Sequence, residues 1–166
     1  MAQERIPATN PTVSLREASA SDVYFLWLWA NDVESRRASR GREPIPWSEH
    51  CAWFETRLKD SGTLVFVAET EDHQPVGSIR FETTDRWSNA RLSYVVAPEA
   101  RGRGFAKAIV SAGCDELRRR RGGVRIVADT LRDNPRSVRV FSSLQWLQKD
   151  NGSIITFEYP SPAGGK

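Results

Sequence analysis

The sequence predicts a single domain of the α+β class, in which helices cover a mixed sheet. A chain of 166 residues has the size of one domain, and neither an internal repeat nor a low-complexity linker divides it. The periodicity of apolar residues changes several times between strand and helix spacing, in the order β, α, α, three strands, α, β, α, β. We therefore expect one domain over residues 12–159, with loose tails at 1–11 and 160–166.

The first third of the chain predicts one strand and two helices. Residues 13–16 alternate apolar and polar side chains, as a short strand does. Ser19 begins a run of N-cap candidates for a helix that reaches about Ala30. A polar, Arg-rich loop is expected over 31–42. Ser48 is then the expected N-cap of an amphipathic helix.

The middle of the chain predicts a meander of three antiparallel strands. Residues 64–68 have the composition of a buried strand, 71–74 that of a hairpin turn, and 76–81 that of its partner strand. A second polar turn at 84–89 leads into a third strand at 91–97, which a proline ends.

The last third alternates helices and strands. Residues 105–119 carry apolar side chains at helical spacing, and two glycines separate them from a strand at 124–128. A helix at about 134–144 and a strand at 154–159 complete the chain. The helices are therefore expected to cover a sheet that is only partly a meander.

Bulk composition excludes several classes of protein. No apolar run approaches the roughly 20 residues that span a bilayer, and the first residues are polar rather than a signal-peptide core, so we expect a cytoplasmic protein. Cys51 and Cys114 form no Cys-x-x-Cys pair, so no metal site is expected. The net charge of +3 suits an anionic ligand but does not distinguish a nucleic acid from a small phosphorylated molecule.

The segment 94–107 predicts a phosphate-binding site. A strand that ends in a Gly-rich turn and continues into a helix directs unpaired N–H groups and the positive end of the helix dipole at one point. Gly104 allows the backbone to approach an anion, and Ala106 keeps the first helical turn small. Three cationic side chains lie in the same segment: Arg101, Arg103 and Lys107.

Two other nucleotide sites are disfavoured at this turn. A P-loop requires Gly-Lys-Ser/Thr after the turn, whereas this chain has Gly104-Phe105-Ala106. A dinucleotide fingerprint requires three spaced glycines in an early βαβ unit, whereas this turn follows an antiparallel meander. A Gly-rich loop without a ligand is the remaining alternative.

The segment 101–106, Arg-Gly-Arg-Gly-Phe-Ala, matches the pattern Q/R-x-x-G-x-G/A at each specified position and resembles the GNAT superfamily of acetyl-CoA-dependent N-acetyltransferases. The resemblance extends to 96–98 and to Asn134-x-x-Ser137-x-x-x-Phe141. It implies a mostly antiparallel, twisted sheet of about six to seven strands with about four helices, and acetyl-CoA as the acetyl donor.

The family resemblance also implies where the cofactor binds. The strand before the turn splays from its neighbour, the pantetheine arm lies in the gap against exposed backbone, and Asn134 reaches the arm from the far side. A backbone N–H in the splay is the expected oxyanion donor. The implied cofactor-binding residues are Tyr94, Val95, Val96, Arg101, Gly102, Arg103, Gly104, Phe105, Ala106, Lys107, Asn134 and Phe141.

A narrower resemblance concerns the acceptor. The patterns at 29–32, 45–54 and 76–81 resemble N-acetyltransferases of UDP-linked 4-amino sugars, as in pseudaminic acid biosynthesis. This implies a small-molecule partner, a nucleotide sugar, for a monomer or homodimer that binds neither nucleic acid nor membrane. Four arginines of the polar loop are then candidates for contact with the nucleotide diphosphate: Arg36, Arg37, Arg40 and Arg42.

The chain departs from the family pattern at two positions. Many members have a tyrosine that protonates the departing thiolate where this chain has Phe141, so that acid is absent or supplied elsewhere. Gln145-Trp146 stands where Gly-Phe usually follows the last helix, which leaves the turn at that point open.

Four side chains are candidates for proton transfer: His50, Glu82, Tyr94 and Asp129. Tyr94 serves as an acid or as a wall of the site. Each of the others has a structural alternative. His50 would cap a helix or pack on Trp53, Glu82 would be a surface charge of an edge strand, and Asp129 would bind an N–H group or an arginine.

Two further functions remain open. One keeps the enzyme class but takes a protein N-terminus, lysine, polyamine or antibiotic as the acceptor, although a basic loop suits a peptide poorly. The other is a non-catalytic module that binds CoA or nucleic acid, although the arginines are scattered and no known nucleic-acid-binding motif is present.

Overall fold

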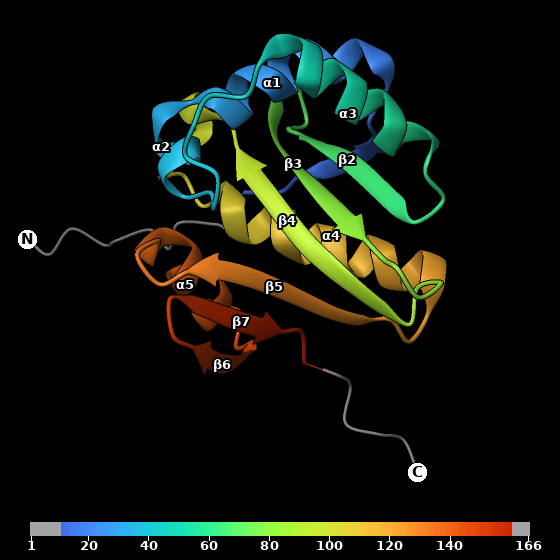
Figure 1. The fold of residues 1–166 in the computed structure, drawn as a ribbon. Coiled ribbons are helices and arrows are strands. Elements are labelled where there is room, and N and C mark those ends of the chain that lie inside the picture. The colour runs from blue at the N-terminus through green and yellow to red at the C-terminus, as the bar shows by residue number, and fades with distance from the viewer. Residues whose placement is uncertain (1–10, 161–166) are drawn as a thin grey trace, which may run out of the picture.

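The computed structural model of the protein describes residues 11–160, so the expected tails at 1–11 and 160–166 lie outside these residues except for Pro11 and Pro160. Within them the chain forms one sheet of seven strands in the order β1-β2-β3-β4-β5-β7-β6 (Figure 1). All neighbours are antiparallel except β4 and β5, which are parallel. The strands are β1 (Ser14–Glu17), β2 (Thr63–Glu69), β3 (Pro75–Glu82), β4 (Asn89–Val96), β5 (Arg125–Leu131), β6 (Leu147–Asn151) and β7 (Ile154–Glu158).

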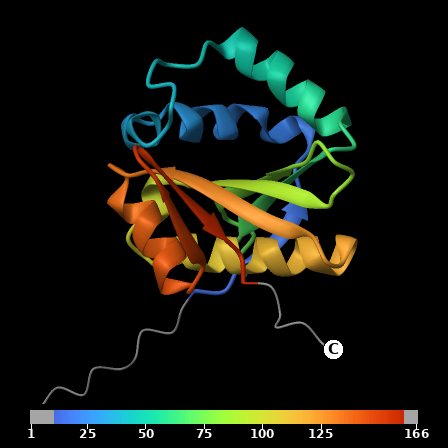
Figure 2. The same cartoon turned by 60° about the horizontal axis from the view of Figure 1, so that its bottom comes forward.

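Helices cover both faces of the sheet, and Figure 2 shows α1, α2 and α3 on one face and α4 and α5 on the other. The helices are α1 (Val23–Asn31), α2 (Val33–Arg37), α3 (Trp47–Lys59), α4 (Phe105–Arg121) and α5 (Pro135–Ser143), with short 3-10 helices η1 (Ala20–Asp22) and η2 (Pro98–Ala100). This arrangement confirms the predicted α+β class.

Side chains of β3 alternate between the two helical layers. Ile79 faces α4, where it packs so closely on Gly113 that a Cβ at that position would collide with it. Arg80 faces the other layer, where its guanidinium carbon lies 4.8 Å from the ring centre of Trp53 on α3. Since neighbouring residues of a strand point to opposite faces, β3 presents an apolar row to α4 and a polar row to α3.

The structure corrects two expectations about the helices. The loop expected over 31–42 contains α2, because the Asp32 side chain accepts hydrogen bonds from the backbone N–H groups of Glu34 and Ser35 and so caps a helical turn. Five α-helices therefore form within residues 11–160, rather than about four. Ser48 is not the N-cap of α3, since the helix begins at Trp47 after Pro46.

The strand expectations are confirmed with one omission. β6 was not expected, because its sequence Leu-Gln-Lys-Asp-Asn has no alternation and all five residues are exposed at the edge of the sheet. β5 also extends to Leu131, beyond the expected end at residue 128, so Asp129 lies within the strand.

A tight turn follows α5 although Gln145 stands where the family usually has a glycine. Gln145 adopts a φ of 59°, the left-handed conformation that glycine usually supplies. The backbone N–H of Trp146 then bonds to the carbonyl of Phe141 at 3.1 Å, and the Trp146 ring packs on the Phe141 ring with centres 4.9 Å apart. Gln145 therefore supports a turn that packs Trp146 against α5.

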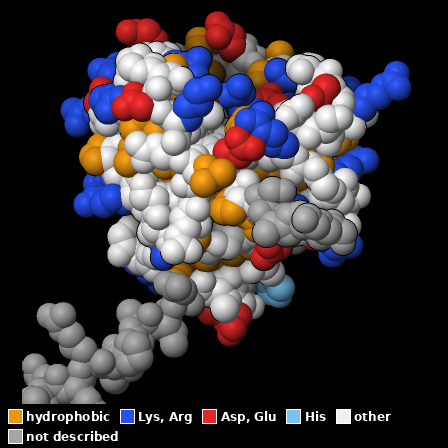
Figure 3. Space-filling view, turned by 90° about the horizontal axis from the view of Figure 1, so that it is seen from below, with side chains coloured by type: hydrophobic (Ala, Val, Ile, Leu, Met, Phe, Trp, Pro, Cys, Tyr) orange, Lys and Arg blue, Asp and Glu red, His pale blue; other side chains and the backbone are white. Residues whose placement is uncertain are grey.

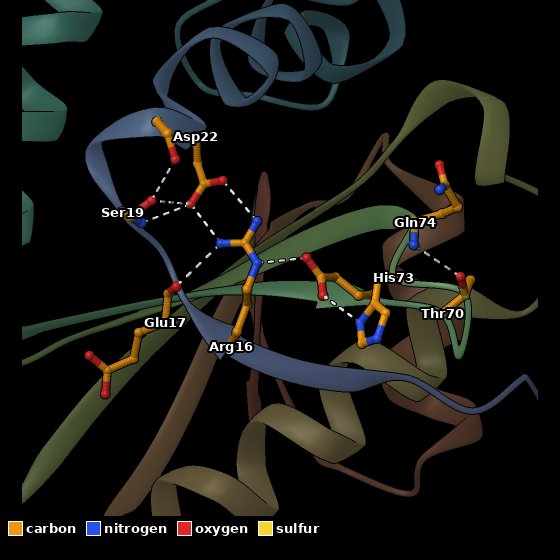
Figure 4. Close-up of polar contacts among 9 residues, drawn as sticks. Arg16, Glu17, Ser19, Asp22, Thr70, His73 and Gln74 are labelled. Carbon is orange, nitrogen blue, oxygen red and sulfur yellow. Dashed lines mark hydrogen bonds and ion pairs between the residues drawn. The ribbon is translucent and has the colours of Figure 1, made fainter.

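A partly buried ion-pair network fixes the start of α1 against the sheet (Figure 4). Arg16 of β1 donates to both carboxylate oxygens of Asp22 at 2.8 Å and to Glu69 of β2 at 2.6 Å. Burial tends to raise the pKa of Asp22, but the Arg16 guanidinium and the Ser19 backbone N–H outweigh burial and lower it. The layer that contains α1 to α3 is therefore anchored to the first two strands.

Candidate functional site

A groove of about 1640 Å³ follows the meeting of β4, β5, α4 and α5 and extends beneath α1, α2 and α3. Of the fifteen residues that the sequence singled out for cofactor binding or proton transfer, thirteen line the groove: His50, Tyr94, Val95, Val96, Arg101, Gly102, Gly104, Phe105, Ala106, Lys107, Asp129, Asn134 and Phe141. Glu82 and Arg103 do not line it. The groove thus brings the candidates together from four separate stretches of the chain.

The groove opens where two neighbouring strands diverge. β4 and β5 are paired from Asn89 and Arg125 only as far as Leu92 and Ala128. Beyond that point β4 remains paired with β3 up to Val96, and β5 remains paired with β7 (Figure 1). Residues 93–96 therefore present one edge of backbone N–H and C=O groups to the groove without a strand partner on that side.

The Gly-rich turn closes one end of the groove. Gly104 is the N-cap of α4 with a φ of 85°, and Gly102 has a φ of 73°. No side chain caps the first turn of α4, so its leading N–H groups are directed at the groove. Arg103 stands outside, with its guanidinium 5.2 Å from the Phe105 ring centre.

These features fit the diphosphate and pantetheine arm of acetyl-CoA. Uncapped N–H groups at a helix N-terminus bind phosphate oxygens, and a strand edge without a partner supplies both donors and acceptors to the amide groups of the arm. Asn134, by contrast, is used within the protein, because its side chain caps α5 by accepting from the backbone N–H of Ser137 at 3.3 Å.

Tyr94 lies against Phe141 and Ser137 on the α5 side of the groove. Its hydroxyl is 2.9 Å from the Ser137 hydroxyl, and its ring meets the Phe141 ring edge-on with centres 5.9 Å apart. Burial raises the pKa of Tyr94, and the hydrogen bond with Ser137 offsets this only in part. A protonated phenol therefore stands beside the position where many relatives carry a tyrosine and this chain carries Phe141.

His50 is buried within α3 and also borders the groove. Its Nε2 lies 3.1 Å from the carbonyl oxygen of Val23, and its ring stacks on Phe54 with centres 6.0 Å apart. A neutral ring that bonds to a carbonyl carries its proton on Nε2, which leaves Nδ1 as an acceptor. Burial lowers the pKa of His50, so the ring is neutral at pH 7.

The two carboxylate candidates are both held by arginines. Glu82 lies outside the groove and pairs with Arg80 at 3.0 Å and with Arg57 at 3.4 Å. Asp129 borders the groove at the point of divergence, where it accepts from Arg91, from Arg40 at 3.0 Å and from Thr156 at 2.8 Å. The roles of all four candidates in proton transfer stay predictions.

The four loop arginines do different things. Arg36 donates to the backbone carbonyls of Ala30, Gly41 and Glu43 and so holds the loop together, and burial lowers its pKa. Arg40 and Arg42 reach across to Asp129 and Asp133. Arg37 borders the groove without a described ion pair among residues 11–160.

An ionic bridge that the sequence did not reveal connects the turn with α2 and α5. Arg101 donates to Asp32 at 2.6 Å, to Glu34 at 3.1 Å and to the Ser35 hydroxyl at 3.0 Å. Glu34 also pairs with Arg136 of α5. Asp32 and Glu34 lie about 70 residues before their partner and belong to no motif, so only the fold brings them to the turn.

We expect Glu34→Gln to tighten acetyl-CoA binding about threefold to tenfold at low ionic strength, because removal of this carboxylate leaves Arg101 and Arg136 less neutralised beside the diphosphate. Titration calorimetry of both proteins at two salt concentrations measures the change. Glu55→Gln removes the same charge from an exposed pair on α3 and serves as the control. Weaker binding by Glu34→Gln would instead show that Glu34 keeps Arg101 in a productive position.

The charge pattern of one face and the side-chain clusters of residues 11–160 also bear on the function. On the face shown in Figure 3, basic and acidic side chains are interspersed rather than gathered into one basic patch. Among residues 11–160, no group of three or more His, Cys, Asp or Glu side chains is arranged to hold a metal ion. No helix in this range has the length and apolar character needed to cross a membrane.

Comparison with protein families identifies one match. A family model described as an acetyltransferase (GNAT) domain matches residues 12–145, which contain the turn, both diverging strands and α5. No curated protein matches the sequence significantly.

Solved structures share the fold at low sequence identity. Spermidine N-acetyltransferase from Vibrio cholerae, in complex with CoA and spermine, is 18% identical with a TM-score of 0.76, and the match covers 89% of this chain and 93% of that one. A domain from Methanocaldococcus jannaschii is 19% identical with a TM-score of 0.77, covering 89% and 97%. A dodecameric form of the Vibrio cholerae protein is 19% identical with a TM-score of 0.72, covering 89% and 93%.

These matches support the wider resemblance and not the narrower one. The spermidine enzymes act on a polyamine, and no nucleotide-sugar acetyltransferase is among the structures described above. The patterns at 29–32, 45–54 and 76–81 therefore lack structural support as marks of a UDP-amino-sugar enzyme.

Proposed function

Because the chain belongs to the family of GNAT acetyltransferases, which transfer the acetyl group of acetyl-CoA to an amine, we propose that the transfer takes place in the groove between β4 and β5, onto the amine of a small molecule. The observation that carries the proposal is the divergence of these strands directly before the uncapped N-terminus of α4. Residues 12–159 are proposed to form the single acetyltransferase domain.

The chain's own groups would hold the donor in three places. The first-turn N–H groups of α4 bind the diphosphate, with Arg101 and Lys107 as nearby cations. The free edge of residues 93–96 bonds to the arm, and one of these N–H groups polarises the acetyl carbonyl. Acetyl-CoA supplies the activated acetyl thioester.

Two side chains have protonation states that suit the proton transfers. The partly buried Tyr94 carries a protonated hydroxyl beside Ser137 of α5, so it is our candidate for protonating the departing thiolate in place of the tyrosine absent at Phe141. The neutral His50 is our candidate for accepting the amine proton, directly or through water. Asp129 is already saturated by two arginines and Thr156, which favours an orienting role.

Two classes of acceptor follow from different observations. The sequence patterns at 45–54 and 76–81 favour a nucleotide-linked amino sugar. The structural similarity to a spermidine acetyltransferase favours a polyamine. Within residues 11–160 the groove has five carboxylates, of which all but Glu49 are paired with arginines, so it offers little free negative charge to a polycation.

The activity is tested by release of free CoA thiol from acetyl-CoA in the presence of an amine panel that contains spermidine, lysine, an amino-terminal peptide and a UDP-4-amino sugar. We expect amine-dependent release and a calorimetric signal for acetyl-CoA alone. Absence of both with folded protein would refute the proposed donor site. Binding without turnover on any amine would favour a CoA-binding module.

A further inference from the structure

Arg80 is a partly buried cation in the part of the groove that lies away from the Gly-rich turn. Its side chain is 29% exposed and points from β3 toward α3, where the guanidinium lies over the Trp53 ring. Its Nε donates to Glu82 at 3.0 Å. The groove reaches Arg80 together with Ser78, Ser93 and Glu49.

The other donors of Arg80 have no described protein partner. Among residues 11–160, no hydrogen bond involves its Nη1 or Nη2. Burial of the guanidinium outweighs the influence of Glu82 and lowers the pKa of Arg80. The two Nη groups are not among the buried atoms without a partner, so they are accessible from the groove, and an anion there would be stabilised by a guanidinium that is only partly hydrated.

Glu82 is shared between two guanidinium groups. Its carboxylate also pairs with Arg57 at 3.4 Å, and Arg57 pairs in turn with Asp60 at 3.5 Å. Of these four charged groups, only Arg80 borders the groove. The groove therefore meets the guanidinium of this cluster and not the carboxylates that balance it.

The position of Arg80 relates this charge to the reaction. Arg80 is the direct cross-strand partner of Ser93, the first residue of β4 beyond the last pair with β5. Adjacent strands are about 4.8 Å apart, so an anion held by Arg80 would lie one to two strand spacings from the point where the acetyl group is expected. This distance corresponds to a few covalent bonds within one small molecule.

We propose that Arg80 binds an anionic group of the acceptor, a carboxylate or a phosphate, and that the acceptor is therefore a small amine that bears an acidic group a few bonds from its amine rather than a polycation. This inference rests on the proposed function of the same groove. The hydroxyl groups of Ser78 and Ser93, which lie on the same face of the sheet as Arg80, are the expected neutral donors to the same anion.

The first experiment uses matched amines that differ only in the acid: tyrosine with tyramine, lysine with cadaverine, and phosphoethanolamine with ethanolamine, with spermidine added. Wild type is expected to favour the acidic member of at least one pair in kcat/KM, and the type of pair distinguishes carboxylate from phosphate. Arg80→Gln should raise KM for that acceptor about 10- to 100-fold and leave KM for acetyl-CoA within about twofold. Arg57→Gln, which alters the same Glu82 pairing outside the groove, should keep the preference.

The second experiment does not depend on the identity of the acceptor. Protein saturated with CoA, so that the diphosphate site is filled, is heated with inorganic phosphate or with acetate and compared with sodium chloride at equal ionic strength. Wild type and Arg57→Gln are expected to gain about 2–4 °C in Tm with at least one anion, and Arg80→Gln is not.

The outcomes separate this inference from the proposed function. Preference for spermidine or for the amines without an acid, or equal anion stabilisation of wild type and Arg80→Gln, would overturn the anion site while the transferase activity stands. Loss of acetyl-CoA binding and of all turnover in wild type would overturn the proposed function itself. If Arg80→Gln fails to fold, Arg80→Lys replaces it and should retain part of the preference with a raised KM.

Discussion

Gly104→Val is expected to abolish acetyl-CoA binding, with the Kd weakened by at least about 100-fold. A valine at a φ of 85° is strained, and a Cβ at this position would meet Pro11 Cδ at 3.0 Å. The strain would shift the first-turn N–H groups of α4, which are the proposed donors to the diphosphate. Titration calorimetry with acetyl-CoA measures the loss.

Gly122→Val separates this effect from a general loss of stability. Gly122 ends the same helix with a φ of 69°, and a Cβ there meets no atom within 4 Å. Each variant should lose about 1–3 kcal/mol of unfolding free energy through backbone strain, but only Gly104→Val should lose the cofactor. Unchanged affinity in folded Gly104→Val would remove the turn from the proposed site.

Tyr94→Phe is expected to lower kcat about 100-fold while the Kd for acetyl-CoA changes by less than about threefold. The substitution removes the only part of the side chain that transfers a proton and leaves its packing on Phe141 intact. Ser137→Ala provides the comparison, since it removes the hydrogen-bond partner and leaves the phenol in place, so only a severalfold loss is expected. Equal rates for Tyr94→Phe and wild type would assign Tyr94 to the wall of the groove.

The pH dependence follows from the same residue. Burial raises the pKa of Tyr94 above its ordinary value of 10.0, so the acid stays protonated while the acceptor amine loses its proton. The value of kcat/KM in wild type should therefore rise with pH and reach a plateau, without an alkaline decline below about pH 10. A decline near pH 8 or 9 would identify a different acid.

Much of the fold could be predicted because most elements have a strong periodic pattern. The buried strands β2 and β3 and the helix α4 carry apolar residues at the spacing that burial requires. By contrast, α2 is five residues long with no buried side chain, and β6 is exposed throughout. Such elements are stabilised by a single cap or by a neighbouring strand, so their own sequence carries little signal.

The candidate site was predictable where one segment contains the whole arrangement. The strand, turn and helix of residues 94–107 are contiguous, so their geometry could be inferred from spacing alone. The contact of Glu34 with Arg101, and the place of Arg80 beside Ser93, depend on which strands become neighbours. In the sequence these residues are isolated charges. Their partners become evident only when the strands are assembled into the sheet.

The short stretch of pairing between β4 and β5 also affects the stability of the domain. Only four residue pairs join β5, β7, β6 and α5 to the remainder of the sheet through this ladder. A ligand hydrogen-bonded to the free backbone edge of residues 93–96 would take the place of a paired strand there. It would thereby hold the carboxyl-terminal third of the chain against the rest of the sheet. The concentration of acetyl-CoA would then affect thermal stability as well as turnover, since a ligand that binds only the native state raises the melting temperature of the protein.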